Sequence, residues 1–203
     1  MNVNKVYLDN PNYPSGLKIY LGANAPTLLA AIGSPDILQN KTFAVFCSVK
    51  CPGSIILKTY DLMHQLRDKG ITVISGFHSP IEKECLNILL KGKQPVIICP
   101  ARSIEGMRIK AEYKKPLEDG RLLMLSPFTE KDKRVSAEIA LERNRFVSAI
   151  ADRIFIAYAE AAGKTEQFCR EILAWNKPIY TFDSDANKNL NILGARSAAE
   201  LGV

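Results

Sequence analysis

The chain has 203 residues, 47% hydrophobic and 24% charged, which is the balance of an ordinary globular protein. This length suits one well-buried α/β domain and is too short for two of ordinary size. The formal net charge of +6 favours anionic partners only weakly. No apolar run is long enough to cross a bilayer, and the first residues lack the apolar core of a secretion signal. The five cysteines include no Cys-x-x-Cys pair, so we expect a reduced, cytoplasmic protein without metal or cofactor.

The order of apolar patterns along the chain predicts the fold. Residues 1–41 are expected to form a lead-in that packs on the core. From there to the end, we expect one domain, 42–203, in which short β-rich runs alternate with helical patterns. The expected strands are 42–46, 71–74, 95–98, 121–125, 154–156 and 178–181. The expected helices are 54–69, 81–91, 104–117, 134–150 and 164–175. Apolar strands separated by helices predict a Rossmann-like, doubly wound, mostly parallel sheet with helices on both faces.

In such a fold a ligand binds beyond the carboxyl ends of the strands, so the loops that follow them are informative. The loop after strand 42–46 carries Ser48 and Lys50 and leads into a helix. A hydroxyl, an ammonium group and a helix N-terminus together can hold an anion. Cys47 and Cys51 in this loop could begin a metal site, but no second Cys/His pair completes it. We interpret both as small buried hydrophobic residues.

The loop after strand 71–74 begins with Ser75 and Gly76. Gly76 is expected to allow a sharp turn, and Ser79 followed by Pro80 is typical of a helix N-cap and first helical residue. Between them, His78 either contacts a phosphate or is a loop histidine near solvent. The sequence does not separate these two readings.

The loop after strand 154–156 carries Gly163, Lys164 and Thr165, which are similar to the end of a Walker A loop. The first glycine of that motif would have to be Tyr158, so the motif fails. What remains is general: Gly163 permits close backbone approach, and the following helix start can hold an anion. We therefore expect three anion-binding loops at one edge of the sheet.

The helix predicted over 134–150 contains Arg143, Asn144 and Arg145. Its apolar face is expected to consist of Val135, Ile139, Phe146 and Ile150. Arg143 falls at the edge of this face, and a guanidinium held against apolar surface needs a partner. That partner is either a carboxylate of this chain or a phosphate of a ligand.

Catalytic signatures are weak. No Gly-x-Gly-x-x-Gly or Gly-x-Ser-x-Gly motif is present, and the only other histidine, His64, lies within a predicted helix. Glu160 and Glu166 could form an acid–base pair for N-glycosidic cleavage, but carboxylates that favour a helix dipole are the better reading. We expect a binding protein rather than an enzyme.

Three segments together resemble the DNA-processing protein A (DprA/Smf) family: Tyr13-Pro14-Ser15-Gly16-Leu17, Ser75-Gly76 with Ile81-Glu82, and Arg143-Asn144-Arg145-Phe146-Val147-Ser148. The resemblance runs from about Asp9 to Phe182. Where the family has Gly-Ser-Arg after the first strand, this chain keeps only Ser48, although Lys50 could replace the charge. The family's extra N-terminal helical domain and winged-helix tail are not found in this sequence, so we expect a divergent relative.

The resemblance implies a Rossmann-like core that binds single-stranded DNA without catalysis, forms a homodimer and delivers DNA to a RecA-type recombinase in natural transformation. An alternative comes from the same superfamily, which includes nucleotide sensors and phosphoribohydrolases. Their Pro-Gly-Gly-x-Gly-Thr-x-x-Glu loop is only faintly matched by Gly163-Lys164-Thr165. The phosphate-binding residues expected under either reading are Ser48, Lys50, Ser75, Gly76, His78, Arg143, Asn144, Arg145, Gly163, Lys164 and Thr165.

Overall fold

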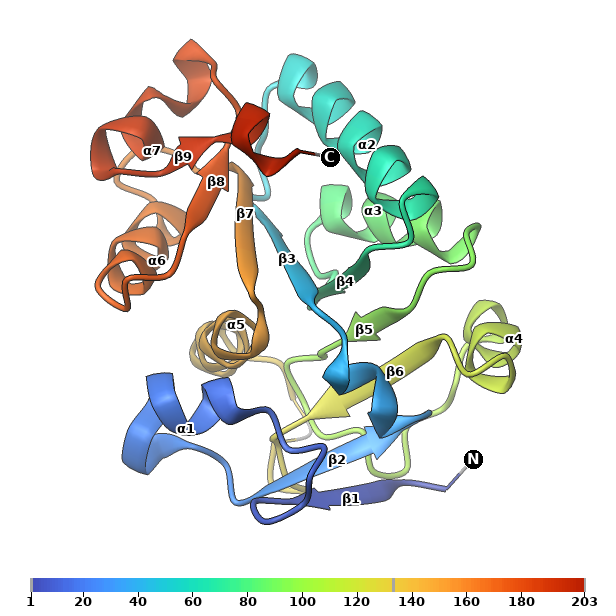
Figure 1. Cartoon of the computed structure of the whole chain (residues 1–203). Helices are drawn as coiled ribbons and strands as arrows, with labels where there is room; N and C mark the ends of the chain where they lie inside the picture. Colours follow the sequence, from blue (N-terminus) through green and yellow to red (C-terminus); the bar gives the residue numbers. More distant parts are fainter. Residues whose placement is uncertain (1, 133, 203) are drawn as a thin grey trace.

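The computed structural model describes residues 2–132 and 134–202, and within them one continuous sheet forms the centre of the molecule (Figure 1). Its strands are β1 (Asn4–Tyr7), β2 (Leu28–Ile32), β3 (Thr42–Cys47), β4 (Thr72–Ser75), β5 (Val96–Ile98), β6 (Leu122–Ser126), β7 (Arg153–Tyr158), β8 (Ile179–Thr181) and β9 (Arg196–Ser197). Its helices are α1 (Ser15–Leu21), α2 (Gly53–Asp68), α3 (Pro80–Leu90), α4 (Ala111–Glu118), α5 (Ala137–Ile150), α6 (Lys164–Leu173) and α7 (Lys188–Leu193).

The strand order is β1-β2-β6-β5-β4-β3-β7-β8-β9. The block from β6 to β9 is parallel throughout, whereas β1 and β2 are added at one side in antiparallel pairing. The chain winds outward from β3 through β4, β5 and β6, and then returns to place β7 on the other side of β3. The predicted Rossmann-like, mostly parallel sheet is confirmed. The loops after β3, β4 and β7 are neighbours at its carboxyl edge.

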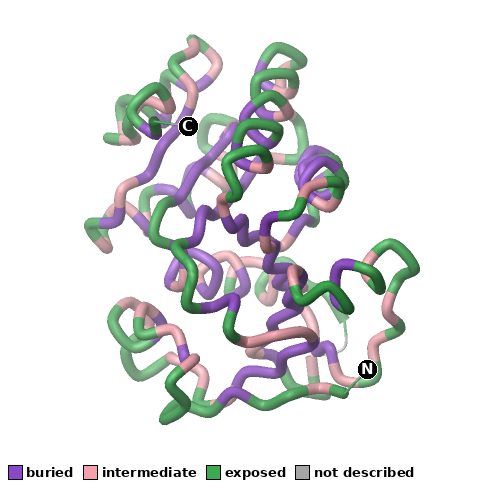
Figure 2. The backbone as a smooth tube through the Cα atoms, turned by 45° about the vertical axis from the view of Figure 1, so that its right-hand side comes forward, coloured by how far each residue is buried: buried purple, intermediate pink, exposed green. Residues whose placement is uncertain are grey.

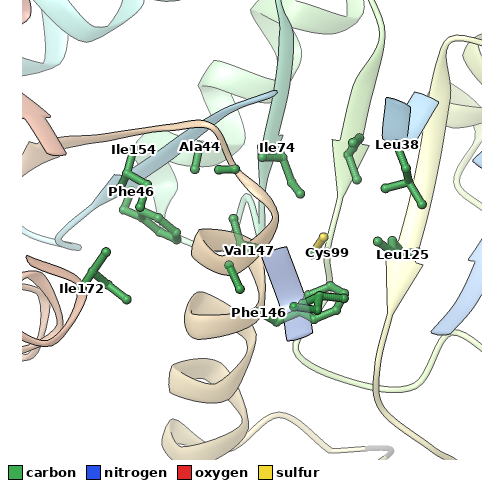
Figure 3. Close-up of a cluster of buried hydrophobic side chains, with 14 of the residues drawn as sticks. Leu38, Ala44, Phe46, Ile74, Cys99, Leu125, Phe146, Val147, Ile154 and Ile172 are labelled. Atoms are coloured by element: carbon green, nitrogen blue, oxygen red, sulfur yellow. The ribbon is translucent and has the colours of Figure 1, made fainter. Parts of the chain in front are cut away.

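Each face of the sheet carries its own hydrophobic cluster because alternate strand residues point to opposite faces. On β3, Ala44 and Phe46 join the cluster beneath α1, α5 and α6, whereas Phe43 and Val45 join the one beneath α2 and α3. Figure 2 shows the strands as the buried centre of the molecule. Figure 3 shows α5 placing Phe146 against the first of these clusters.

Two predicted helices begin later than expected. The helix predicted from residue 104 begins only at Ala111, because Gly106 adopts a left-handed conformation (φ 67°) in an irregular segment. The helix predicted from residue 134 begins at Ala137, because the Ser136 side chain accepts a hydrogen bond from the Ile139 N–H and caps it. Val135 is therefore outside the helix and 51% exposed, and its assignment to the apolar face was wrong.

The first forty residues contribute β1, α1 and β2, none of which the sequence analysis identified. Two contacts hold the segment in place. The Tyr13 hydroxyl donates to the Pro26 carbonyl at 2.6 Å, and α1 packs so closely on α5 that a Cβ at Gly16 would lie 2.1 Å from the Ala149 carbonyl oxygen. A division of the chain at residue 41 stays a prediction. No helix among the described residues is long and apolar enough to cross a membrane.

Candidate functional site

The loops after β3 and β7 are joined by Ser48. Its hydroxyl donates to Thr165 Oγ1 at 2.9 Å and accepts from the Glu160 N–H at 3.3 Å. The contact exists because β3 and β7 are adjacent and end at the same level. Two of the three loops predicted to hold an anion therefore meet, with Ser48 and Thr165 both half-buried between them.

The loops after β3 and β4 are joined by Glu82, the third residue of α3. Its carboxylate accepts from the Cys47 N–H at 3.0 Å, the His78 N–H at 2.8 Å and the Ser79 N–H at 3.3 Å. Ser79 in turn caps α3 and accepts from the Glu82 N–H, so the two residues form a capping box. Ser79 and Pro80 are confirmed as N-cap and first helical residue. The Ser-x-x-Glu spacing signals this box in the sequence, but not the reach of Glu82 to β3.

Arg143 lies beneath the ends of β4 and β5, directly against Gly76. A Cβ built at Gly76 would fall 0.7 Å from Arg143 Nη1 and 1.8 Å from its Cζ. The residue in this loop that adopts a left-handed conformation is Phe77 (φ 47°), not Gly76. The expectation that Gly76 serves the turn is therefore corrected: the glycine makes room for a guanidinium.

The Arg143 guanidinium is only partly satisfied. Its side chain is buried at 5% exposure, Nη1 donates to the Cys99 carbonyl at 3.3 Å, and Nε is buried without a partner. Among the described residues no carboxylate forms an ion pair with it. Burial lowers the pKa of this guanidinium, and the negative charge of Glu82 acts against that shift. Of the two partners considered for Arg143, an internal ion pair is not found.

Arg145 does not reach the loops. Two positions further along α5, it points away from the sheet and makes two hydrogen bonds to the Glu171 carboxylate of α6, at 2.6 and 2.9 Å. Asn144, between the two arginines, has a buried Oδ1 without a partner. The three consecutive residues therefore lie in different environments, and only Arg143 contacts the loops at the ends of the strands.

The remaining predicted residues divide by exposure. Lys50, His78 and Lys164 are exposed on the three loops, where they are free to meet a ligand. Ser75 is fully buried, and its hydroxyl donates to the Val45 carbonyl at 2.7 Å, so it ties two strands together. Gly163 closes the third loop through its N–H bond to the Glu160 carbonyl at 2.9 Å.

Glu166 is fully occupied within the fold. It accepts from Asn189 at 2.7 Å, Arg170 at 2.8 Å and the Ala162 N–H at 3.2 Å. The hydrogen bond from Asn189, followed by that from Arg170, lowers the pKa of this carboxyl. A carboxylate held ionised in this way is a poor general acid near neutral pH, which weakens the acid–base reading of Glu160 and Glu166.

The five cysteines are free thiols. Cys47, Cys85, Cys99 and Cys169 are buried, whereas Cys51, expected to be buried, is only half-buried because it lies in the loop before α2. Burial raises the pKa of Cys99 and Cys169 to about 12. Within the described residues no group of three or more His, Cys, Asp or Glu side chains is placed to hold a metal ion.

Comparison with known proteins bears on the family and the fold of the chain. The family model for DNA recombination-mediator protein A matches residues 4–201. The structure of DNA processing protein A from Streptococcus pneumoniae superposes with a TM-score of 0.79 at 17% identity, covering 98% of this chain and 71% of that one. That of Helicobacter pylori, described for its single-stranded DNA binding mode, gives 0.76 at 20% identity, covering 96% of this chain and 90% of that one.

A more distant similarity extends to another class of protein. The molybdenum cofactor binding protein of Rippkaea orientalis superposes with a TM-score of 0.54 at 11% identity, covering 78% of this chain and 89% of that one. No curated protein matches the chain significantly.

Proposed function

This chain belongs to the DNA recombination-mediator protein A family, and on that premise we propose that it binds single-stranded DNA without catalysing a reaction. Backbone phosphates are held at the carboxyl edge of the sheet, where the loops after β3, β4 and β7 meet. The solved relative from Helicobacter pylori is described as binding single-stranded DNA, and this chain has the same fold.

The observation that carries the proposal is the unpaired Arg143 guanidinium. A buried charge without a counter-ion costs several kcal/mol, so a protein retains one when a ligand supplies the missing charge. Phosphate oxygens suit the planar fork of a guanidinium. Gly76 supports this role because the absence of its Cβ gives the guanidinium its place next to the loop.

The exposed cations and the helix starts add long-range attraction. Lys50 and Lys164 lie on the loops after β3 and β7, and Lys164 opens α6. The free N–H groups of such a helix start carry partial positive charge. Contacts of this kind track a phosphate backbone without reading base sequence, so we expect binding with little sequence preference.

A mononucleotide is the alternative ligand, since the same edge of related folds takes small phosphorylated molecules. The buried arginine would serve either ligand equally well. The two differ in salt dependence, because a strand that contacts several cations releases several counter-ions and a mononucleotide does not.

The test is a fluorescence-anisotropy titration of labelled single-stranded DNA at low and moderate salt, with AMP as competitor. Arg143→Gln should weaken binding about tenfold or more, as expected for loss of a charged hydrogen-bonding partner. Arg145→Gln is the matched control, because it lies on the same helix but faces away from the loops. Wild-type affinity in a folded Arg143→Gln protein, or full displacement of DNA by AMP, would contradict the DNA proposal.

We also propose the family's assembly for this chain: a homodimer that delivers DNA to a RecA-type recombinase in natural transformation. The five free thiols fit a reducing cytoplasm. Light scattering after gel filtration tests the dimer. Co-sedimentation of the recombinase with DNA-bound protein tests the delivery step, and a monomer that sediments alone would contradict both.

A further inference from the structure

A second concave site lies beside α5, and neither Gly76 nor Arg143 lines it. It is a cleft of about 790 Å³ between the end of α1, the loop after β6, α5 and the end of α6. Figure 1 shows α6, α5 and α1 one after another along the left-hand side of the sheet. The volume falls within the range of ligand-binding pockets. Nothing in the proposed DNA site uses this cleft.

One wall of the cleft is a fixed aromatic platform. Trp175 stacks on Tyr20 with ring centroids 5.5 Å apart and planes 20° from parallel. Behind Tyr20 lies the Lys177 ammonium, 4.1 Å from the ring centroid. Lys177 is itself fixed by hydrogen bonds of 2.6 to 2.9 Å to three carbonyls around the end of α5. The platform is therefore held in place before any partner arrives.

The charges in the cleft oppose the net charge of the chain. Among the described residues that line it, the carboxylates are Asp132, Glu142 and Glu171, and the only cation is Arg145. Arg145 neutralises Glu171 through their paired hydrogen bonds. Asp132 and Glu142 remain, and Glu142 is exposed without an ion pair in the described structure. The described lining thus has three carboxylates and one cation, a formal net charge of −2, in a chain of formal net charge +6.

This combination disfavours nucleic acid and favours a cation. Carboxylates repel the phosphates that dominate the affinity of single strands. A guanidinium, by contrast, stacks on an indole face while its edge donates to a carboxylate. Arginine is also among the residues that contribute most at protein interfaces, together with tryptophan and tyrosine.

We propose that this cleft is a docking site for a basic segment of a protein partner, which places an arginine side chain against Trp175 and beside Glu142. Neither Arg143 nor any residue of the loops after β3, β4 and β7 lines this cleft, so a partner bound here leaves the phosphate site open. The docking site does not depend on DNA binding, and a chain that binds no DNA can still have it.

Trp175 is the only tryptophan of the chain, so its emission reports directly on the cleft. The probe is a short peptide of alternating arginine and glycine at low salt, compared with lysine–glycine and glutamate–glycine peptides of equal length. We expect a saturable change in Trp175 emission with the arginine peptide, a weaker response with lysine, and none with glutamate. AMP and single-stranded DNA are titrated in parallel.

The matched variants are both on α5. Glu142→Gln should lower the affinity for the arginine peptide about fivefold, which is the effect of one ion pair at the surface. Glu138 lies on the same helix but outside the cleft, so Glu138→Gln should leave this affinity unchanged. An unchanged emission with the arginine peptide would overturn the proposal. So would equal weakening by both variants, or a saturable response to AMP in place of the peptide, which would assign the cleft to a nucleobase.

Discussion

Replacement of Gly76 by alanine tests the link between this glycine and Arg143. The backbone of Gly76 is not left-handed, so alanine meets no conformational penalty there. The added Cβ would lie 0.7 Å from Arg143 Nη1, 1.8 Å from Cζ and 2.6 Å from Nη2. The guanidinium must therefore move by roughly 3 Å to reach van der Waals distance.

The expected cost follows from what Arg143 loses. Moving the guanidinium breaks its bond to the Cys99 carbonyl, worth about 1.5–3 kcal/mol for a charged donor, in a site that has little room for another rotamer. We expect Gly76→Ala to lower the free energy of unfolding by about 3 kcal/mol, or Tm by roughly 6–12 °C. DNA affinity should fall as far as in Arg143→Gln.

A double-mutant cycle in urea, followed by far-ultraviolet circular dichroism, isolates the contact. In an Arg143→Ala background the clash is gone, so Gly76→Ala should cost less than about 0.5 kcal/mol, or even stabilise slightly. The coupling energy between the two sites should exceed about 2 kcal/mol. Additive effects within about 0.5 kcal/mol would refute the argument that Gly76 exists to admit Arg143.

Three further substitutions test the connections around α5 and the loops. Glu82→Gln should lower the free energy of unfolding, measured in urea, by about 2–3 kcal/mol, because an amide replaces an anion where three N–H groups converge. Glu84 is exposed on the same helix, so Glu84→Gln should leave the free energy of unfolding unchanged. Lys177→Met should cost about 2–4 kcal/mol because it leaves three carbonyls at the end of α5 without a donor, and an unchanged urea midpoint would mean that water replaces the ammonium. Glu166→Gln should cost about 1 kcal/mol at neutral pH. Because the folded pKa of Glu166 is lowered from 4.5, the difference from wild type should persist above about pH 4.5 and vanish as pH falls through the folded value. A difference independent of pH would contradict the role of the charge.

The sequence predicted the parallel strands from β3 to β8 because each is a short apolar run between helical patterns. It missed β1, β2 and β9 for physical reasons. β2, Leu28–Ile32, is rich in leucine and alanine, which favour helices, and is identified as a strand only by its pairing with β1 and β6. β9 has two residues, and β1 buries one of four.

The site was predictable in outline because parallel strands end at one edge, which brought the three loops together. The burial of Arg143 followed from the apolar stripe. The separation of Arg145 from Arg143 follows from helix geometry, since two residues correspond to about 200° of rotation. The sequence analysis treated the two arginines as one motif and therefore did not predict this separation. The reach of Glu82 to Cys47 depends on how α3 packs beside β3, and no local pattern encodes that.

The position of β2 in the sheet has a consequence for synthesis on the ribosome. Besides β1 it pairs with β6, and α1, the helix just before it, packs on α5. Neither β6 nor α5 exists until more than half of these 203 residues have been made. Three residues that are fully buried in the folded protein therefore stay exposed in the nascent chain until β6 and α5 are made: Leu17, Leu29 and Ala31. The parallel strands β3, β4 and β5 can associate meanwhile, so α1 and β2 join the fold after strands that follow them in the chain. Such delayed pairing of distant segments slows folding and prolongs exposure to aggregation and to chaperones.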